Sequence, residues 1–225
     1  MMEKKKRATP WKPGKVISIS LRNGVYVLAQ MVRDPYLVFF NHFNEENNWK
    51  GVTLKEEDIL FCKAVTRQFL RYSPVTIVKE VNPLLDYALS KEWIYSHIGG
   101  HPITVSVKGR ERQLAGFGRR CSLVLADKDS GQPEDNPLMG LFQAYIIPDI
   151  KEQDWDRVGQ AEHMSIEVFP TLNERLYLCF LYGKNINPEQ DISLGKPLPD
   201  DYETYIDILT NSPEARRLYL GVHEE

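Results

Sequence analysis

The segment Trp11–Phe43, WKPGKVISISLRNGVYVLAQMVRDPYLVFFNHF, decides how the chain begins to fold. It contains three apolar runs rich in β-branched and aromatic residues, a composition typical of strands. These runs are residues 16–21, 25–32 and 36–40. Asn23-Gly24 separates the first two runs and favours a hairpin, because both residues tolerate positive φ. Asp34-Pro35 separates the second run from the third, since proline cannot donate a ladder hydrogen bond. The segment therefore predicts a three-stranded antiparallel meander.

Two further apolar runs extend this meander into an SH3-like, partly open β-barrel over about residues 11–80. They are residues 59–65 and 75–79. Four apolar residues then recur at helical spacing and predict a short closing helix: Leu84, Leu85, Ala88 and Leu89. Residues 1–10, MMEKKKRATP, form a basic tail that we expect to be mobile. These features predict a barrel domain at residues 11–96.

The rest of the chain mixes strand and helix patterns. Apolar or alternating runs predict strands at residues 103–107, 121–126, 165–169 and 175–182. Residues 138–147 are apolar and fit either a helix or a strand. Residues 127–137, rich in Asp, Gly, Pro and Asn, predict an exposed loop.

The C-terminal part carries clear helix signals. After a linker bounded by Pro197 and Pro199, apolar residues at helical spacing predict a helix over 202–209. Ser212-Pro213 predicts the start of a last helix that ends at Leu220. The expected fold class is therefore α+β and β-rich, with an acidic α+β domain at residues 97–225.

Composition narrows the class of protein. Hydrophobic residues make up 42% of the chain and charged residues 26%, which permits a packed core. No apolar run is long enough to span a membrane, and we expect that the protein does not bind a membrane. Three widely spaced cysteines within apolar runs indicate buried thiols in a reducing cytoplasm: Cys62, Cys121 and Cys179.

The net charge of −3 conceals an uneven distribution. Residues 1–80 carry 14 Lys and Arg against 8 Asp and Glu, whereas residues 145–225 carry 7 against 16. The acidic third is either a solvated surface or a field that attracts a basic partner and repels nucleic acid.

We find no motif of a known active site, and we predict no catalytic residues, no cofactor and no metal. His97 and His101 lie four residues apart, but Gly99-Gly100 and Pro102 argue against the helix that would bring them together. A different cluster sets one large aromatic among four acids: Asp149, Glu152, Asp154, Trp155 and Asp156. Such a cluster suits partner binding, in which the ring is buried and the acids steer the approach. Alternatively, Trp155 packs inward and the acids face water.

The opening segment resembles the immunity protein 26 family of bacterial polymorphic toxin systems. The family motif residues are Lys12, Gly14, Gly24, Tyr26 and Gln30, followed by the apolar third strand. The resemblance extends to about Phe69. It implies a cytoplasmic protein, not an enzyme, that binds a cognate toxin and blocks it by occlusion. The toxin in such systems is often a nuclease or another effector, and many nuclease toxins are basic, which agrees with the acidic third of this chain.

Two other classes of function remain open. A barrel could bind nucleic acid through a basic face that includes Arg22, Arg33, Lys50 and Lys55, although the acidic third would repel this partner. A hydrolase with an unrecognised site is the other alternative.

Overall fold

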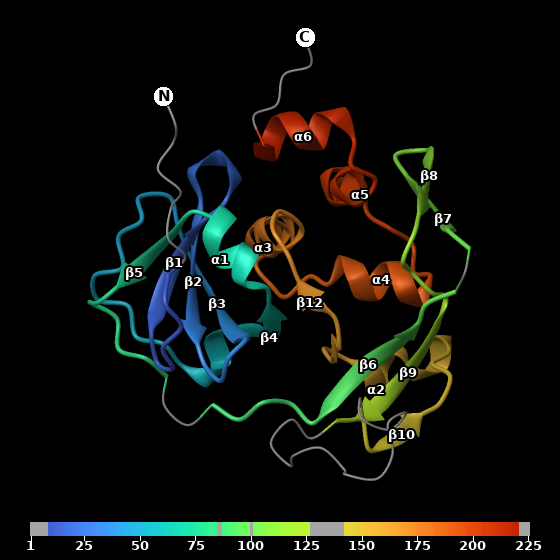
Figure 1. The fold of residues 1–225 in the computed structure, drawn as a ribbon, viewed down its shortest axis with the longest axis horizontal. Coiled ribbons are helices and arrows are strands. Elements are labelled where there is room, and N and C mark those ends of the chain that lie inside the picture. The colour runs from blue at the N-terminus through green and yellow to red at the C-terminus, as the bar shows by residue number, and fades with distance from the viewer. Residues whose placement is uncertain (1–8, 85–86, 100, 127–141, 221–225) are drawn as a thin grey trace. The chain divides into compact units, whose positions relative to one another are not determined.

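The computed structural model describes residues 9–84, 87–99, 101–126 and 142–220. These residues form two compact units, which Figure 1 shows. Unit 1 consists of Met1–Tyr87 and Ser165–Ile186, and unit 2 of Ala88–Met164 and Asn187–Glu225. The domains predicted at 11–96 and 97–225 differ from these units, because the chain returns to unit 1 at Ser165–Ile186. The predicted loop at 127–137 and most of the predicted tail at 1–10 lie outside the described residues.

Unit 1 is built on a six-stranded sheet in the order β12-β4-β3-β2-β1-β5. The strands are β1 (Val16–Ser20), β2 (Tyr26–Met31), β3 (Tyr36–Asn44), β4 (Ile59–Val65), β5 (Val75–Val78) and β12 (Ile166–Glu167). Its helices are η1 (Arg22–Gly24), η2 (Glu56–Asp58), α1 (Arg67–Tyr72) and α3 (Thr171–Tyr182). The predicted meander and the α+β, β-rich class are confirmed. Within the described residues the sheet is open, with β12 and β5 as its outer strands.

The Asn23-Gly24 turn forms as the sequence predicts. Asn23 has φ 59° and Gly24 has φ 74°, both in the left-handed region. β1 and β2 pair antiparallel, with Ser20 opposite Tyr26. The turn therefore fixes the register that places Ile17 and Ile19 of β1 in the core.

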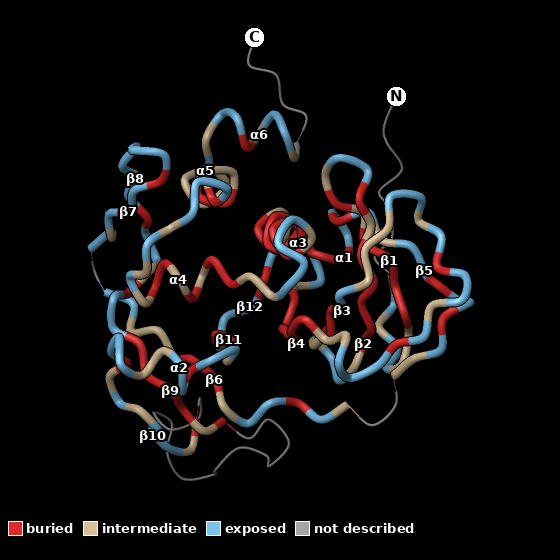
Figure 2. Tube along the Cα trace, turned by 180° about the vertical axis from the view of Figure 1, so that it is seen from behind, coloured by how far each residue is buried: buried red, intermediate tan, exposed pale blue. Residues whose placement is uncertain are grey.

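Residues 175–182, predicted as a strand, belong to helix α3, and this prediction was wrong. Aromatic and Leu-rich composition suggested a strand, but Leu172, Leu176 and Cys179 recur at helical spacing and all lie in the core of unit 1. Figure 2 shows α3 buried along most of its length. Only Ile166–Glu167 of the predicted strand at 165–169 is extended in the sheet, where it pairs parallel to β4.

Polar contacts also attach α3 to the turn between β1 and β2. The Arg22 guanidinium bonds both carboxylate oxygens of the fully buried Glu174, at 2.9 and 3.1 Å. It also lies 3.7 Å from the centre of the Tyr177 ring. The Asn23 amide donates to the Tyr177 hydroxyl at 2.8 Å. The turn and the helix therefore hold each other in place.

On the other face of the sheet, Gln30 of β2 bonds the backbone of Leu84. The Gln30 amide nitrogen donates to the Leu84 carbonyl at 2.8 Å, and the Leu84 N–H donates to the Gln30 carbonyl oxygen at 2.7 Å. A helix over 84–89 would use the Leu84 carbonyl for its own bonds. No helix is present at the described residues of this segment, so the prediction of a closing helix was wrong.

Unit 2 contains a four-stranded sheet in the order β10-β9-β6-β11 and a separate β7-β8 hairpin. The strands are β6 (Glu92–His97), β7 (Ile103–Val107), β8 (Arg110–Leu114), β9 (Arg120–Leu125), β10 (Ala144–Ile147) and β11 (Glu162–His163). The helices are η3 (Glu152–Asp154), α2 (Trp155–Val158), α4 (Pro188–Leu194), η4 (Asp200–Tyr202), α5 (Glu203–Leu209) and α6 (Pro213–Leu220). The predicted strands at 103–107 and 121–126 and the last two helices are confirmed.

We predict that Gln30→Leu lowers the free energy of unfolding by about 2–3 kcal/mol. The substitution leaves the N–H and carbonyl of the half-buried Leu84 without their partner, and a polar group left unsatisfied away from water costs about 1–3 kcal/mol. Urea denaturation measures this change. Gln153→Leu, at an exposed position, is the control and should change stability by no more than about 0.5 kcal/mol. Equal losses in the two variants would contradict the role given to Gln30.

Candidate protein-binding face

The four-stranded sheet of unit 2 has two faces of different character. Ile94, Cys121 and Leu123 point to one side and pack into the core of this unit. Because side chains alternate along a strand, their neighbours Tyr95 and Ser122 point to the opposite side. That opposite side, with the outer strand β10, is the candidate face.

A row of rings crosses the candidate face. Their centres are separated by 4.9 Å between His97 and Tyr95, 5.2 Å between Tyr95 and Phe142, and 4.8 Å between Phe142 and Tyr145. Phe142 is 8% exposed, but Tyr145 is 49% exposed. The row therefore ends in an aromatic ring that is open to solvent.

The exposed end of the row lies on an outer strand. β10 pairs only with β9 among the described residues. Ile146, next to Tyr145, is 37% exposed. Tyr145 pairs with Val124 and Ile147 with Leu123, so Ile146 is the extra residue of a β-bulge. Two exposed apolar side chains at this bulge are suited to contact with another protein.

His97 and Ser122 lie close together on this face but do not form a catalytic pair. The Ser122 hydroxyl donates to the Pro148 carbonyl at 2.6 Å, and a carbonyl can only accept. The hydroxyl has one hydrogen, so His97 Nε2, at 2.8 Å, must be the donor to Ser122. A histidine in that role cannot remove the serine proton. The pair instead fixes the turn at Pro148.

A second group, Cys121, Ser96 and His163, lies toward the core of unit 2. Ser96 Oγ is 3.6 Å from Cys121 Sγ and 3.0 Å from His163 Nδ1. Burial raises the pKa of the Cys121 thiol, which keeps it protonated and poorly nucleophilic. All three cysteines are buried free thiols, as predicted. In the described ranges, no three His, Cys, Asp or Glu side chains are placed to hold a metal ion.

The structure places the predicted partner-binding residues on consecutive turns, and some of them have local roles. The Asp149 carboxylate bonds Lys151 Nζ at 2.8 Å, and this bond lowers the pKa of Asp149. Asp154 accepts the Lys151 backbone N–H at 2.9 Å and so closes the turn η3. Glu152 and Asp156 are exposed. These last two acids are therefore the ones available to a partner.

Trp155 occupies an intermediate position. Its ring packs against the core that contains Val158, and it is only partly buried. Lys196 Nζ lies 5.3 Å from the ring centre. The indole thus contributes to the core and keeps part of its surface exposed.

The family motif residues shape the start of the sheet in unit 1. Gly14 has φ 78° and donates its N–H to the Met31 carbonyl at 2.7 Å. The Lys12 N–H reaches the Met31 sulfur at 3.4 Å. Gly24 closes the hairpin, Tyr26 begins β2 at intermediate burial, and Gln30 binds the Leu84 backbone. These residues stabilise the fold.

The basic residues considered for nucleic acid are partly neutralised. Arg22 is paired with Glu174, and Lys55 Nζ lies 3.0 Å from a Glu57 carboxylate oxygen. Lys50 is exposed. Two of the four cations therefore already have a carboxylate partner.

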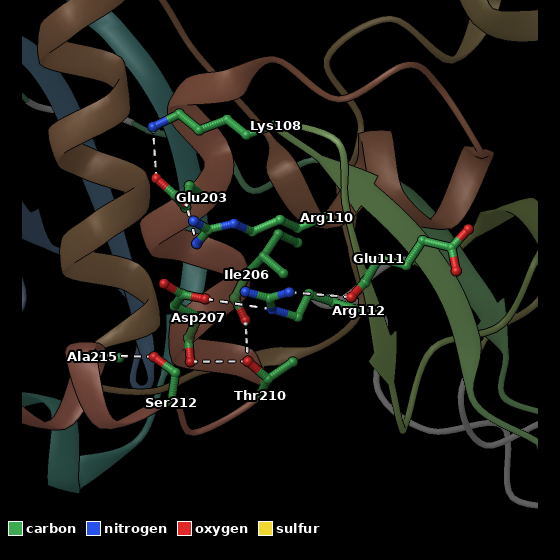
Figure 3. A network of polar contacts seen from close by, with 10 residues as sticks. All are labelled: Lys108, Arg110, Glu111, Arg112, Glu203, Ile206, Asp207, Thr210, Ser212 and Ala215. Atoms are coloured by element: carbon green, nitrogen blue, oxygen red, sulfur yellow. Dashed lines mark hydrogen bonds and ion pairs between the residues drawn. The ribbon is translucent and has the colours of Figure 1, made fainter.

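Sequence reasoning missed a charged cluster in unit 2, which Figure 3 shows. Lys108 and Arg110 of the β7-β8 hairpin lie 2.6 and 3.6 Å from the carboxylate of Glu203 in α5. Arg112 Nε lies 3.8 Å from Asp207. Burial raises the pKa of Asp207, whereas the bond from Lys108 lowers the pKa of Glu203.

This cluster leaves no space for a ligand, because the cavity among its side chains is about 10 Å³, room for about one water. Its three cations instead neutralise part of the acidic third.

We predict that two substitutions shift the pKa of His97 in opposite directions. Burial lowers this pKa, Arg120 lowers it further, and Asp149 raises it. Arg120→Gln should therefore raise it and Asp149→Asn should lower it further, as measured by NMR titration of the imidazole. Because folded His97 binds its proton less readily than unfolded His97, its titration should destabilise the fold as the pH falls below about 6.5. Shifts of the same sign in both variants would contradict this arrangement.

Comparison with known proteins gives one family match. Residues 5–108 match a family described as "Domain of unknown function (DUF8309)". The match covers the first five strands of unit 1 and continues through β6 and β7 of unit 2. No curated protein matches the chain, and no solved structure matches it. In the described part of the chain, no helix is both long enough and apolar enough to cross a bilayer.

Proposed function

We propose that this chain is a cytoplasmic immunity protein that binds a bacterial toxin and neutralises it by occlusion. The observation that carries the proposal is the exposed apolar end of the candidate face, Tyr145 and Ile146 on β10. The resemblance of the opening segment to the immunity protein 26 family supplies the class of partner.

The chemistry of the candidate face favours a protein partner. Aromatic residues are enriched at the centres of protein interfaces, where they bury much area at little cost in conformational entropy. Tyr145 is supported from behind by Phe142, which is buried and holds the ring in position. An outer strand can in addition pair with a strand of the partner. This face therefore combines an anchor with a strand that, in the described part of the chain, has a neighbour on one side only.

Exposed acids next to β10 along the chain would steer a basic toxin. Glu152 and Asp156 follow β10 within ten residues and are exposed. The acids of α5 contribute less to such a field, because Glu203 and Asp207 face the cations of the hairpin. Complementary charges raise association rates by about 10–10³-fold.

The first test is rescue of cells that express the toxin encoded in the reading frame next to this gene. We predict that the unaltered chain restores growth and that the double variant Tyr145→Ala/Ile146→Asp does not. The purified pair should show a dissociation constant at least about tenfold weaker for the variant, because one lost interface anchor costs about 2 kcal/mol or more.

The matched control for this test is Leu218→Asp in α6, which changes another exposed apolar residue of unit 2. It should leave rescue and affinity unchanged. Equal loss in the control and the double variant, or rescue by the double variant, would contradict the assignment of the face. No binding of the toxin by the unaltered chain would contradict the function itself.

The second test concerns the rate of association. We predict that Glu152→Lys/Asp156→Lys lowers the association rate constant by about tenfold at low salt and weakens its salt dependence, while the dissociation rate changes little. Stopped-flow mixing with the toxin measures both rates. Asp154 is left intact, because its carboxylate holds the turn. An unchanged association rate would exclude steering by these acids.

A further inference from the structure

Unit 2 has a groove along β7 that is separate from the candidate face. The groove encloses about 270 Å³. Its walls are β7 on one side and the end of α4 with the following extended chain on the other. The lining residues are Thr104, Val105, Ser106, Arg119, Ile192 and Gly195–Leu198.

The hairpin geometry shows which backbone groups of β7 face away from β8. Val107 pairs with Arg110 across the two-residue turn Lys108-Gly109, whose φ angles of 50° and 69° are those of a tight hairpin turn. Such a turn is closed by a hydrogen-bonded pair, and hydrogen-bonded and open pairs alternate along an antiparallel ladder. Val105 therefore bonds β8, and the N–H and carbonyl groups of Thr104 and Ser106 point outward.

These outward groups line the groove. Among the described residues, β7 pairs with β8 alone, so this edge has no other strand beside it. The Thr104 carbonyl accepts one bond, from Arg119. The N–H groups of Thr104 and Ser106 and the Ser106 carbonyl remain available to a further extended segment.

Arg119 sets the charge of the groove. Its guanidinium donates to the Thr104 carbonyl at 2.8 Å and to the Ile192 carbonyl at 3.0 Å. Both partners are neutral, and no carboxylate of the described residues pairs with it. A guanidinium has five N–H donors, so these two bonds leave others for an anion.

The second cation of the groove is already balanced. Lys196 Nζ lies 3.1 Å from the Asp191 carboxylate, which also accepts the Tyr202 hydroxyl at 2.6 Å. The groove thus carries one uncompensated positive charge, that of Arg119, which is held in place by two carbonyls.

We propose that this groove binds an extended peptide segment that carries a carboxylate. The segment adds as a strand to the open edge of β7 through the backbone of Thr104 and Ser106, and its carboxylate bonds Arg119. Strand addition supplies affinity through main-chain hydrogen bonds, and the guanidinium selects an acidic side chain or a C-terminal carboxylate. This site does not depend on the proposed toxin binding and would remain if that function were wrong.

The test uses two blocked pentapeptides, Ac-Thr-Val-Glu-Val-Thr-amide and the same peptide with Gln in place of Glu. We predict saturable binding of the Glu peptide to the full chain, with amide shifts in β7 and at Arg119 in ¹H–¹⁵N NMR spectra. The Gln peptide should bind roughly tenfold more weakly, because it lacks the charge-assisted bond. Equal affinities of the two peptides, or shifts away from β7, would overturn the proposal.

Two proline variants test the strand addition. Ser106→Pro removes an outward N–H of β7 and should abolish peptide binding, because proline at an outer edge spares the hairpin ladder but cannot donate. Gln113→Pro is the matched control, since Gln113 lies opposite Thr104 in an open pair and its N–H faces the far edge of β8. The Gln113→Pro variant should bind the peptide normally. Equal loss in both variants would overturn strand addition.

Simple anions test whether the backbone of the peptide contributes to binding. Inorganic phosphate and acetate should shift Arg119 only weakly at millimolar concentration and should not saturate the amides of β7. Saturation by either anion at the concentration at which the Glu peptide saturates would show that the backbone edge adds nothing, and would overturn the peptide as the occupant.

Discussion

Unit 1 depends on burying helix α3, which begins at Thr171, against a sheet whose first five strands end at Val78. Nine consecutive residues of α3, Thr171–Cys179, are buried, and Glu174 among them is charged. Arg22 offsets part of the cost of burying this charge, and removing one partner of a buried ion pair costs about 3–5 kcal/mol. The same guanidinium covers the Tyr177 ring, and the next residue, Asn23, bonds the Tyr177 hydroxyl. A tight turn early in the chain is therefore matched to a helix that follows residues 88–164, which belong to unit 2.

The parts of the fold that could be predicted from sequence are those fixed by neighbouring residues. The Asn23-Gly24 hairpin, the meander and the helix that begins after Ser212 all depend on local turn or capping chemistry. The errors occurred where a distant partner decides the structure. Residues 84–89 have the spacing of a helix, but Gln30 binds the Leu84 backbone instead. Residues 175–182 have strand composition, but they continue a helix whose buried residues, Thr171–Cys179, include Leu172, Leu176 and Cys179 in the core of unit 1.

At the candidate sites, too, the features that depend on distant residues could not be predicted from the sequence. The acidic cluster at 149–156 was visible in the sequence, yet the local bonds of Asp149 and Asp154 appear only once the turn around Lys151 is known. Tyr145 lies in a run that fitted either a helix or a strand, so its position on an outer strand could not be foreseen. The groove on β7 had no sequence signal, because it consists of backbone groups and an arginine held by two carbonyls.

Charge counted along the sequence is a poor guide to the field around this chain. The acidic third includes Glu203 and Asp207, which face Lys108, Arg110 and Arg112 from the middle of the chain. It also includes Glu174, which is buried against Arg22 from the basic third. In each such pair the fields of the two opposite charges cancel, so little field extends beyond about a Debye length. The unpaired charge that a partner meets on the described residues includes negative charge at Glu152 and Asp156 and positive charge at Arg119. Two surfaces of opposite sign on one unit are suited to two different ligands.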